Sequence, residues 1–313
     1  MSQEWILGLN AYHADAAACL VRGGEVVVAS EVERLSRVKH ATGLPVRAVA
    51  ACLETVGIEL GQVTHMAVNR NPRARLLDKL RYTVTRWPDP RLVLARLRNA
   101  HAWAGVAEGL ASAFPDQTLR AQFHPVEHHL AHLASAFYPS PFPEALAVSL
   151  DGFGDFASVA WGVGRGAHLA IAGRIPFPHS LGLLYQAITQ YLGFYAYGDE
   201  YKVMGLAALG REDPELTRLL SRLVYPSGHG RFKLALGYFR HHRDPVVYRW
   251  DGGAPQIGQL FSAKLESLLG PARLASAPLE PRHADIARAA QQVFEDRAYA
   301  LLEALRKESG QTR

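Results

Sequence analysis

From Val126 to Gly154 the chain contains the stretch VEHHLAHLASAFYPSPFPEALAVSLDGFG, in which three different kinds of segment follow one another. The first, EHHLAHLASAF, consists of residue types that favour a helix. On a helix His128 and His132 lie on one face because they are four residues apart, whereas His129 is expected to point elsewhere. A proline-rich break then leads to a short apolar run that is typical of a buried strand and ends at Asp151.

Two imidazoles from a helix and a carboxylate from a strand end form a donor set that suits a divalent cation with open coordination positions. Gly152 and Gly154 follow Asp151, and a glycine turn there would let backbone N–H groups approach a phosphate. The sequence therefore predicts a metal and phosphate site at His128, His132 and Asp151. A His-x-x-x-His pair is a weak signal by itself, so ordinary core or surface histidines are the alternative.

Composition indicates a globular protein, because 49% of the 313 residues are hydrophobic and 20% are charged. A chain of this length can bury a sizeable core and favours two domains over one. No apolar run approaches the roughly 18 residues of a membrane span, and the N-terminus lacks the pattern of a signal peptide. The two cysteines, Cys19 and Cys52, are expected to be free thiols. We therefore expect a cytoplasmic protein that does not associate with a membrane.

The net charge of +5 is concentrated in one segment. From Arg70 to Arg98, nine lysines and arginines accompany two aspartates, so this segment carries +7 and the remainder about −2. Interleaved leucines favour an amphipathic helical insertion with a solvated basic face near residues 70–115. A docking surface for an anionic partner is the alternative. Nucleic acid is not an expected partner, because the segment lacks the aromatic interleaving of a nucleic-acid platform.

Apolar periodicity predicts strands and helices along the whole chain. Strands are expected at residues 5–10, 16–21, 25–30, 64–69, 120–125, 145–150, 158–163 and 168–177. Helices are expected at residues 45–56, 127–137, 181–192, 214–223, 257–269 and 284–306. The charged segments 31–40 and 197–207 are expected to be loops that line a site. The order strand–turn–strand–strand at the N-terminus recurs after residue 145.

Six sequence blocks, in the same order along the chain, together resemble one family. They are LGLNAYHADAAA at 7–18, EVERLSRVKH at 31–40, the segment around 128–132, DGFG at 151–154, PHSLGLLY at 178–185 and EYKVMGLA at 200–207. This combination is similar to the O-carbamoyltransferases related to nodulation protein U and tobramycin carbamoyltransferase. The resemblance implies an α/β protein with the actin-like ATPase fold, which consists of two RNase-H-like lobes. Residues 1–143 would form a complete first lobe, and residues 144–313 an incomplete second lobe.

The resemblance also implies roles for individual positions. An active-site iron or manganese ion would bind to His128, His132 and Asp151. The carbamoyl phosphate end of the reaction intermediate would contact His13 and Lys39, with His13 removing the acceptor's hydroxyl proton. The positions that would hold phosphate and nucleotide are Gly152, Gly154, Lys202 and Gly205.

In this family carbamoyl phosphate and ATP first give carbamoyl-adenylate in a YrdC-like domain. The carbamoyl group is then transferred to a hydroxyl group of a small acceptor, commonly a sugar or a natural product. The family continues beyond the matched part, so we expect a second chain that supplies the rest of the second lobe and a YrdC-like domain, or else a homo-oligomer. We expect little transfer by this chain alone. The alternatives are a non-catalytic remnant that binds a metal or a partner and, less favoured, a sugar-kinase-like ATPase.

Overall fold

The computed structural model describes residues 4–86, 105–244, 248–249 and 254–313. Its contacts divide the chain into two compact units. Unit 1 comprises Met1–Ala74, Pro90–His128 and Val247–Gln256, and unit 2 comprises Arg75–Asp89, His129–Val246 and Ile257–Arg313. The division into lobes at residues 143 and 144 stays a prediction, and residues 87–104 of the predicted basic insertion lie outside the described residues.

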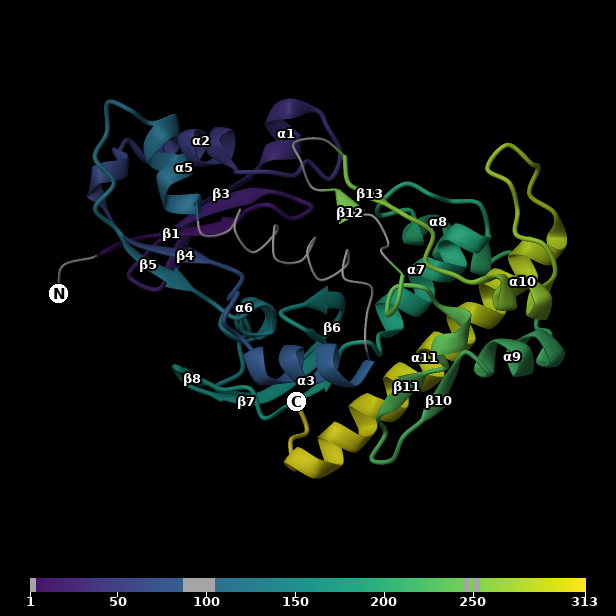
Figure 1. Cartoon of the computed structure of the whole chain (residues 1–313). Helices are drawn as coiled ribbons and strands as arrows, with labels where there is room; N and C mark the ends of the chain where they lie inside the picture. Colours follow the sequence, from purple (N-terminus) through teal and green to yellow (C-terminus); the bar gives the residue numbers. More distant parts are fainter. Residues whose placement is uncertain (1–3, 87–104, 245–247, 250–253) are drawn as a thin grey trace. The chain divides into compact units, whose positions relative to one another are not determined.

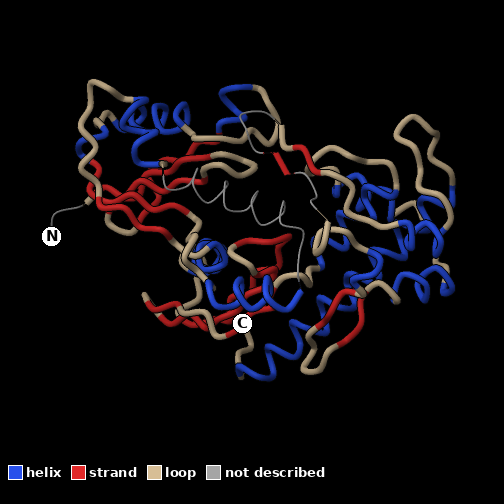
Figure 2. Tube along the Cα trace, in the orientation of Figure 1, coloured by secondary structure: helices blue, strands red, loops and turns tan. Residues whose placement is uncertain are grey.

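Unit 1 contains a five-stranded sheet in the order β3-β2-β1-β4-β5 (Figures 1 and 2). Its strands are β1 (Trp5–Asn10), β2 (Ala17–Arg22), β3 (Glu25–Glu31), β4 (Val63–Val68) and β5 (Gln122–Pro125). The first three strands are antiparallel, whereas β4 runs parallel to β1 and β5 parallel to β4. Each of these five strands was predicted within two residues. The alternating burial of β1 and β2 supplies the period-two pattern from which a half-buried strand is recognised.

The helices described in unit 1, together with a short 3-10 turn, pack around one core. These elements are α1 (Val32–Ser36), α2 (Val46–Val56), η1 (Leu60–Gln62) and α5 (Val106–Ala113). Val49 and Leu53 of α2 and Leu110 of α5 are buried in the core that contains Leu7, Leu20 and Met66 of the sheet. The expectation of a plain loop at residues 31–40 was wrong for its first half, which forms α1.

Unit 2 contains a smaller antiparallel sheet in which β7 lies between β6 and the pair β8 and β9. Its strands are β6 (Glu144–Gly154), β7 (Ala157–Arg165), β8 (His168–Leu169) and β9 (Gly173–Pro176). The single strand expected at 168–177 is interrupted at residues 170–172, where the backbone of Ala170 passes so close to Gly162 that a Cβ there would collide with the Ala170 carbonyl oxygen.

The end of β6 also differs from the prediction. The strand continues through Asp151 to Gly154, with an irregular register after Leu150, and the tight turn follows at Asp155 and Phe156. These two residues are not glycines, yet their φ values of 45° and 69° lie in the left-handed region that usually favours glycine. The predicted glycine turn at residues 152–154 is therefore an irregular strand end.

Helices form most of the rest of unit 2, namely α3 (Leu76–Arg86), α7 (Leu181–Tyr191), α8 (Glu200–Ala207), α9 (Pro214–Ser221), α10 (Ala263–Leu269) and α11 (Pro281–Ser309). The helix α6 (His128–Phe137) begins at the last residue of unit 1 and continues in unit 2. The long helix α11 contacts α7, α8 and α9 (Figure 1). Short strands and a 3-10 turn complete the described elements: β10 (Val224–Pro226), β11 (Phe232–Leu234), η2 (Leu236–Tyr238), β12 (Tyr248–Arg249) and β13 (Gln256–Ile257).

Two predictions for the later part of the chain were wrong. Residues 200–207 form α8 rather than a loop, because Glu200, Lys202, Met204 and Leu206 are good helix formers that outweigh one glycine. The helix expected from 257 begins at Ala263, where Ser262 caps it by accepting from the backbone N–H of Lys264. Every helix among the described residues is too short or too polar to traverse a lipid bilayer.

Candidate metal centre

The three predicted ligands come together where α6 begins and β6 becomes irregular. One ligand atom each from His128, His132 and Asp151 lies within 4.8 Å of the other two. His132 Nε2 is 3.8 Å from Asp151 Oδ2, which is too long for a hydrogen bond. Ligand atoms bound to one cation at about 2.1 Å are roughly 3–3.5 Å apart, so small side-chain movements would suffice to bind an ion.

The three side chains differ in exposure. His128 is 8% exposed, whereas the side chains of His132 and Asp151 are 47% and 31% exposed. The centre therefore has one side shielded by protein and one side open to an incoming molecule.

Asp151 is held by its own strand and by the start of α7. The backbone N–H of Gly152 donates to Asp151 Oδ1 at 2.6 Å, and Ser180 Oγ donates to the Asp151 carbonyl oxygen at 2.9 Å. Gly182 lies so close that a Cβ on it would be 3.0 Å from the same carbonyl oxygen. Ser180 and Gly182 belong to the sequence block 178–185, but no role was predicted for either, because their role depends on a contact between distant segments.

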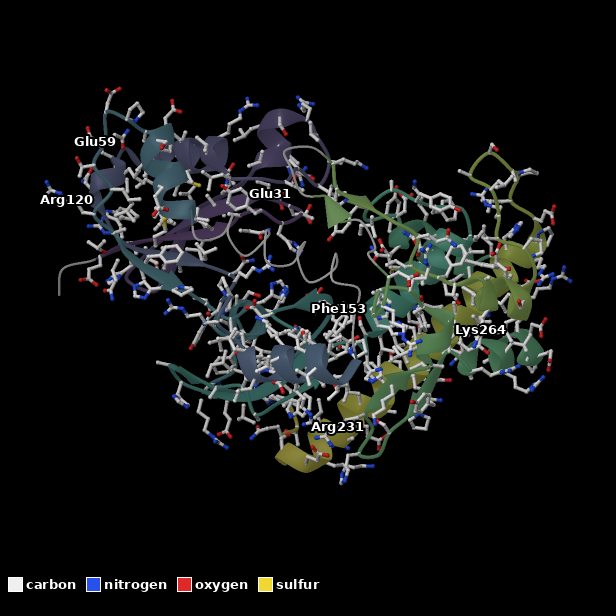
Figure 3. The ribbon with its side chains drawn as sticks, in the orientation of Figure 1. Glu31, Glu59, Arg120, Phe153, Arg231 and Lys264 are labelled. Atoms are coloured by element: carbon white, nitrogen blue, oxygen red, sulfur yellow. The ribbon has the colours of Figure 1, made fainter. Side chains whose placement is uncertain are left out.

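The irregular end of β6 is also fixed by aromatic packing. Phe153, which is labelled in Figure 3, belongs to this strand end. Its ring lies 4.9 Å from that of Phe177 and is stacked at 5.7 Å on that of His241. His241 is buried, and its Nε2 lies 2.8 Å from the carbonyl oxygen of Pro178. Packing of the Phe153 ring therefore holds the segment that follows Asp151 in place.

His129 points away from the ligand group, towards β6. Its Nδ1 is 2.9 Å from Ser149 Oγ, and both side chains are buried. Ser149 was missed in the sequence, although it is the only polar residue in the apolar run that precedes Asp151. That isolated polar residue is the signal that could have identified it.

His13 lies next to the buried ligand. The ring centroids of His13 and His128 are 5.9 Å apart. The loop between β1 and β2 that carries His13 is held by Asn10, whose Nδ2 donates to the carbonyl oxygens of Ala14 and Asp15 at 2.8 Å each. The structure therefore places His13 of the first sequence block beside His128.

Lys39 lies on a segment that is tied to the same loop. The next residue, His40, has its Nδ1 2.8 Å from Asp15 Oδ1, and its backbone N–H donates to Glu33 Oε2 at 3.0 Å. Asp15, Glu33 and His40 form the second group of ligand-type atoms within 4.8 Å among the described residues. Lys39 itself is exposed to solvent.

The residues predicted to contact phosphate and nucleotide lie on two elements, β6 and α8. Lys202 Nζ is 2.6 Å from Asp199 Oδ1, and this hydrogen bond raises the pKa of Lys202. Because Lys202 and Gly205 are on α8, they are fixed by that helix rather than by a loop. A Cβ on Gly152 or Gly205 would meet no atom within 4 Å, so protein packing does not require glycine at either position.

The two cysteines are free thiols, as predicted. Burial raises the pKa of both Cys19 and Cys52, so both favour the protonated form that is a poor nucleophile and a poor ligand. Neither belongs to the ligand groups found among the described residues.

Residues 94–310 match the family described as "Carbamoyltransferase N-terminus". An uncharacterised protein of Synechocystis sp. is 34% identical over 304 residues, covering 93% of this chain and 46% of that protein. Nodulation protein NolNO of Sinorhizobium fredii is 37% identical over 207 residues, covering 66% of this chain and 29% of that protein. The chain therefore spans less than half the length of these relatives.

Among solved structures, HypF of T. kodakarensis is 14% identical, with 99% of this chain and 41% of that chain covered and a TM-score of 0.36. This similarity is too low to support an argument about the fold. The match to the family covers more than half of the chain and includes the segment with His128, His132 and Asp151. This protein therefore belongs to the carbamoyltransferase family and corresponds to its N-terminal region.

Proposed function

We propose that this chain takes part in the transfer of a carbamoyl group to a hydroxyl group of a small molecule, such as a sugar or a natural product. Membership of the carbamoyltransferase family supports this chemistry. The observation that carries the proposal is the convergence of His128, His132 and Asp151, with ligand atoms within 4.8 Å of one another. The proposed donor is carbamoyl-adenylate, formed from carbamoyl phosphate and ATP.

A divalent cation fits the donor set of this centre. Two imidazoles and one carboxylate suit iron or manganese and leave positions for other ligands. Asp151 Oδ1 accepts from Gly152, which leaves Oδ2 directed towards His132. When bound, the cation supplies Lewis-acid polarisation of the carbamoyl carbonyl group.

His13 is the proposed acceptor of the hydroxyl proton. A general base has to come within hydrogen-bond reach of that proton, about 2.6–3.2 Å between heavy atoms. Because the rings of His13 and His128 are 5.9 Å apart, a small molecule at the buried ligand is also within reach of His13. Lys39 is the proposed positive charge that faces the phosphate of the donor, and its exposure leaves it accessible.

We also propose the actin-like ATPase architecture for the chain. Its support is the strand order β3-β2-β1-β4-β5, in which three antiparallel strands are followed by two parallel ones, as in an RNase-H-like lobe. In this proposal phosphate and nucleotide contact Gly152, Gly154, Lys202 and Gly205. We further propose that a second chain supplies the rest of the second lobe and a YrdC-like domain that makes the adenylate, with a homo-oligomer as the alternative.

The proposal is tested with the purified chain, Mn²⁺ and synthetic carbamoyl-adenylate. Because the adenylate is supplied, the assay does not depend on its synthesis. We expect bound Mn²⁺ and Mn²⁺-dependent binding of the adenylate, both lost in His128→Ala. The matched control is His168→Ala, an exposed histidine on β8 whose loss is expected to change neither quantity. A wild-type chain that binds neither Mn²⁺ nor, in the presence of Mn²⁺, carbamoyl-adenylate would contradict the proposal.

A further inference from the structure

The two elements that carry the candidate ligands are joined by a buried hydrogen bond. His129 Nδ1 on α6 lies 2.9 Å from Ser149 Oγ on β6. His129 is 0% exposed and Ser149 is 8% exposed, so water does not compete for this bond. Neither side chain is itself a candidate ligand.

This bond continues an apolar seam between α6 and β6. Leu133 and Phe137 of the helix pack with Ala145 and Ala147 of the strand in one buried cluster. His129 precedes Leu133 by four residues and so lies on the same helix face. In the same way Ser149 follows Ala147 by two residues and lies on the same face of the strand. The polar pair is therefore the last contact of the seam.

The ligands lie directly beyond this last contact. His128 immediately precedes His129, and His132 follows it by three residues on the adjoining turn of α6. Asp151 follows Ser149 by two residues, at the point where the pairing of β6 with β7 becomes irregular. Ser149 still pairs regularly with Ala160, so it is the last well-anchored position of the strand on this face before Asp151.

We propose that the His129–Ser149 pair positions the metal centre by setting the distance between the helix with two ligands and the strand with the third. This inference rests on the proposed function for the identity of the centre. Ligand distances in metal sites are tolerant to about 0.2 Å, and loss of supporting hydrogen bonds typically lowers metal affinity about 10–100-fold. His129 thus contributes to metal binding although it is not a ligand.

The test uses the full chain and Co²⁺, whose visible absorption reports on coordination geometry. We expect Ser149→Ala to weaken Co²⁺ binding by about 10-fold or more and to alter the absorption bands. Ser149→Thr retains the hydroxyl group and is expected to bind Co²⁺ nearly as wild type does. Where Ser149→Ala does not fold, His129→Asn, which keeps a polar atom near the position of Nδ1, is compared with His129→Leu.

The matched control is Thr189→Ala on α7. Thr189 is also buried, and its Oγ1 donates to the Tyr185 carbonyl oxygen at 2.9 Å, but it belongs to neither ligand-bearing element. Its loss is expected to lower the melting temperature and leave Co²⁺ affinity unchanged. Two results would contradict this inference alone, given that wild type binds Co²⁺. One is an unchanged Co²⁺ affinity in Ser149→Ala, and the other is a loss of Co²⁺ affinity in Thr189→Ala as large as that in Ser149→Ala. If wild type binds no Co²⁺, both the proposed function and this inference are contradicted.

Discussion

Replacing Gly182 with alanine is expected to weaken metal binding while changing the stability of the fold little. Gly182 is the second residue of α7, and a Cβ there would lie 3.0 Å from both the Asp151 carbonyl oxygen and the Gly152 nitrogen. Ordinary contacts of a Cβ begin at 3.4 Å, so the two segments have to separate by about 0.4 Å. The neighbouring atoms belong to the backbone and cannot rotate away.

That displacement acts on the residue that carries the third ligand. A movement of about 0.4 Å exceeds the tolerance of roughly 0.2 Å for ligand distances, so we expect metal affinity to fall about 10-fold. Stability changes less, because alanine is favoured over glycine in a helix by up to about 1 kcal/mol, which offsets strain of similar size.

The assay is a Co²⁺ titration of the variant, combined with thermal unfolding in the presence of a chelator. Gly205→Ala is the matched control, since it is a glycine on a helix where a Cβ would meet no atom within 4 Å. It is expected to raise stability by about 1 kcal/mol without changing Co²⁺ affinity. Equal Co²⁺ affinities of Gly182→Ala and wild type would refute the argument that α7 supports Asp151.

The remaining predictions concern phosphate binding, packing and the thiols. Gly152→Ala is expected to leave the melting temperature unchanged and weaken carbamoyl-adenylate binding in a calorimetric titration, because its Cβ enters open space beside Asp151; unchanged binding would argue against a phosphate there. Tyr185→Phe removes the 2.7 Å hydrogen bond to Gln291 and is expected to cost about 1 kcal/mol in urea unfolding. Burial raises the pKa of Cys19 and Cys52, so the native thiols are expected to react slowly with a disulfide reagent. Rapid labelling of the native thiols at pH 8 would contradict this expected slow reaction. Because the folded state holds the thiol protons more tightly, the free energy of unfolding is expected to fall as pH rises past the ordinary thiol pKa of 9.0, as measured by urea unfolding at increasing pH.

Elements with a strong local pattern were predictable from the sequence. β1 and β2 of unit 1 alternate between buried and more exposed residues, and α2 and α6 consist largely of helix-forming residues. The errors fall where local signals compete. The composition of α8 favours a helix, but its glycine and paired charges suggested a loop, and the glycines after Asp151 suggested a turn that the structure forms at Asp155 and Phe156.

The sequence by itself determined the helix with His128 and His132 on one face and the strand that leads to Asp151, because spacing along one element is a local property. Only the tertiary structure decided that Ser149 meets His129, that Gly182 supports Asp151 and that His13 reaches His128. These contacts join segments that are up to about a hundred residues apart, and each depends on how buried surfaces pack rather than on the preference of any one segment. The surroundings of each candidate ligand are therefore a property of tertiary packing.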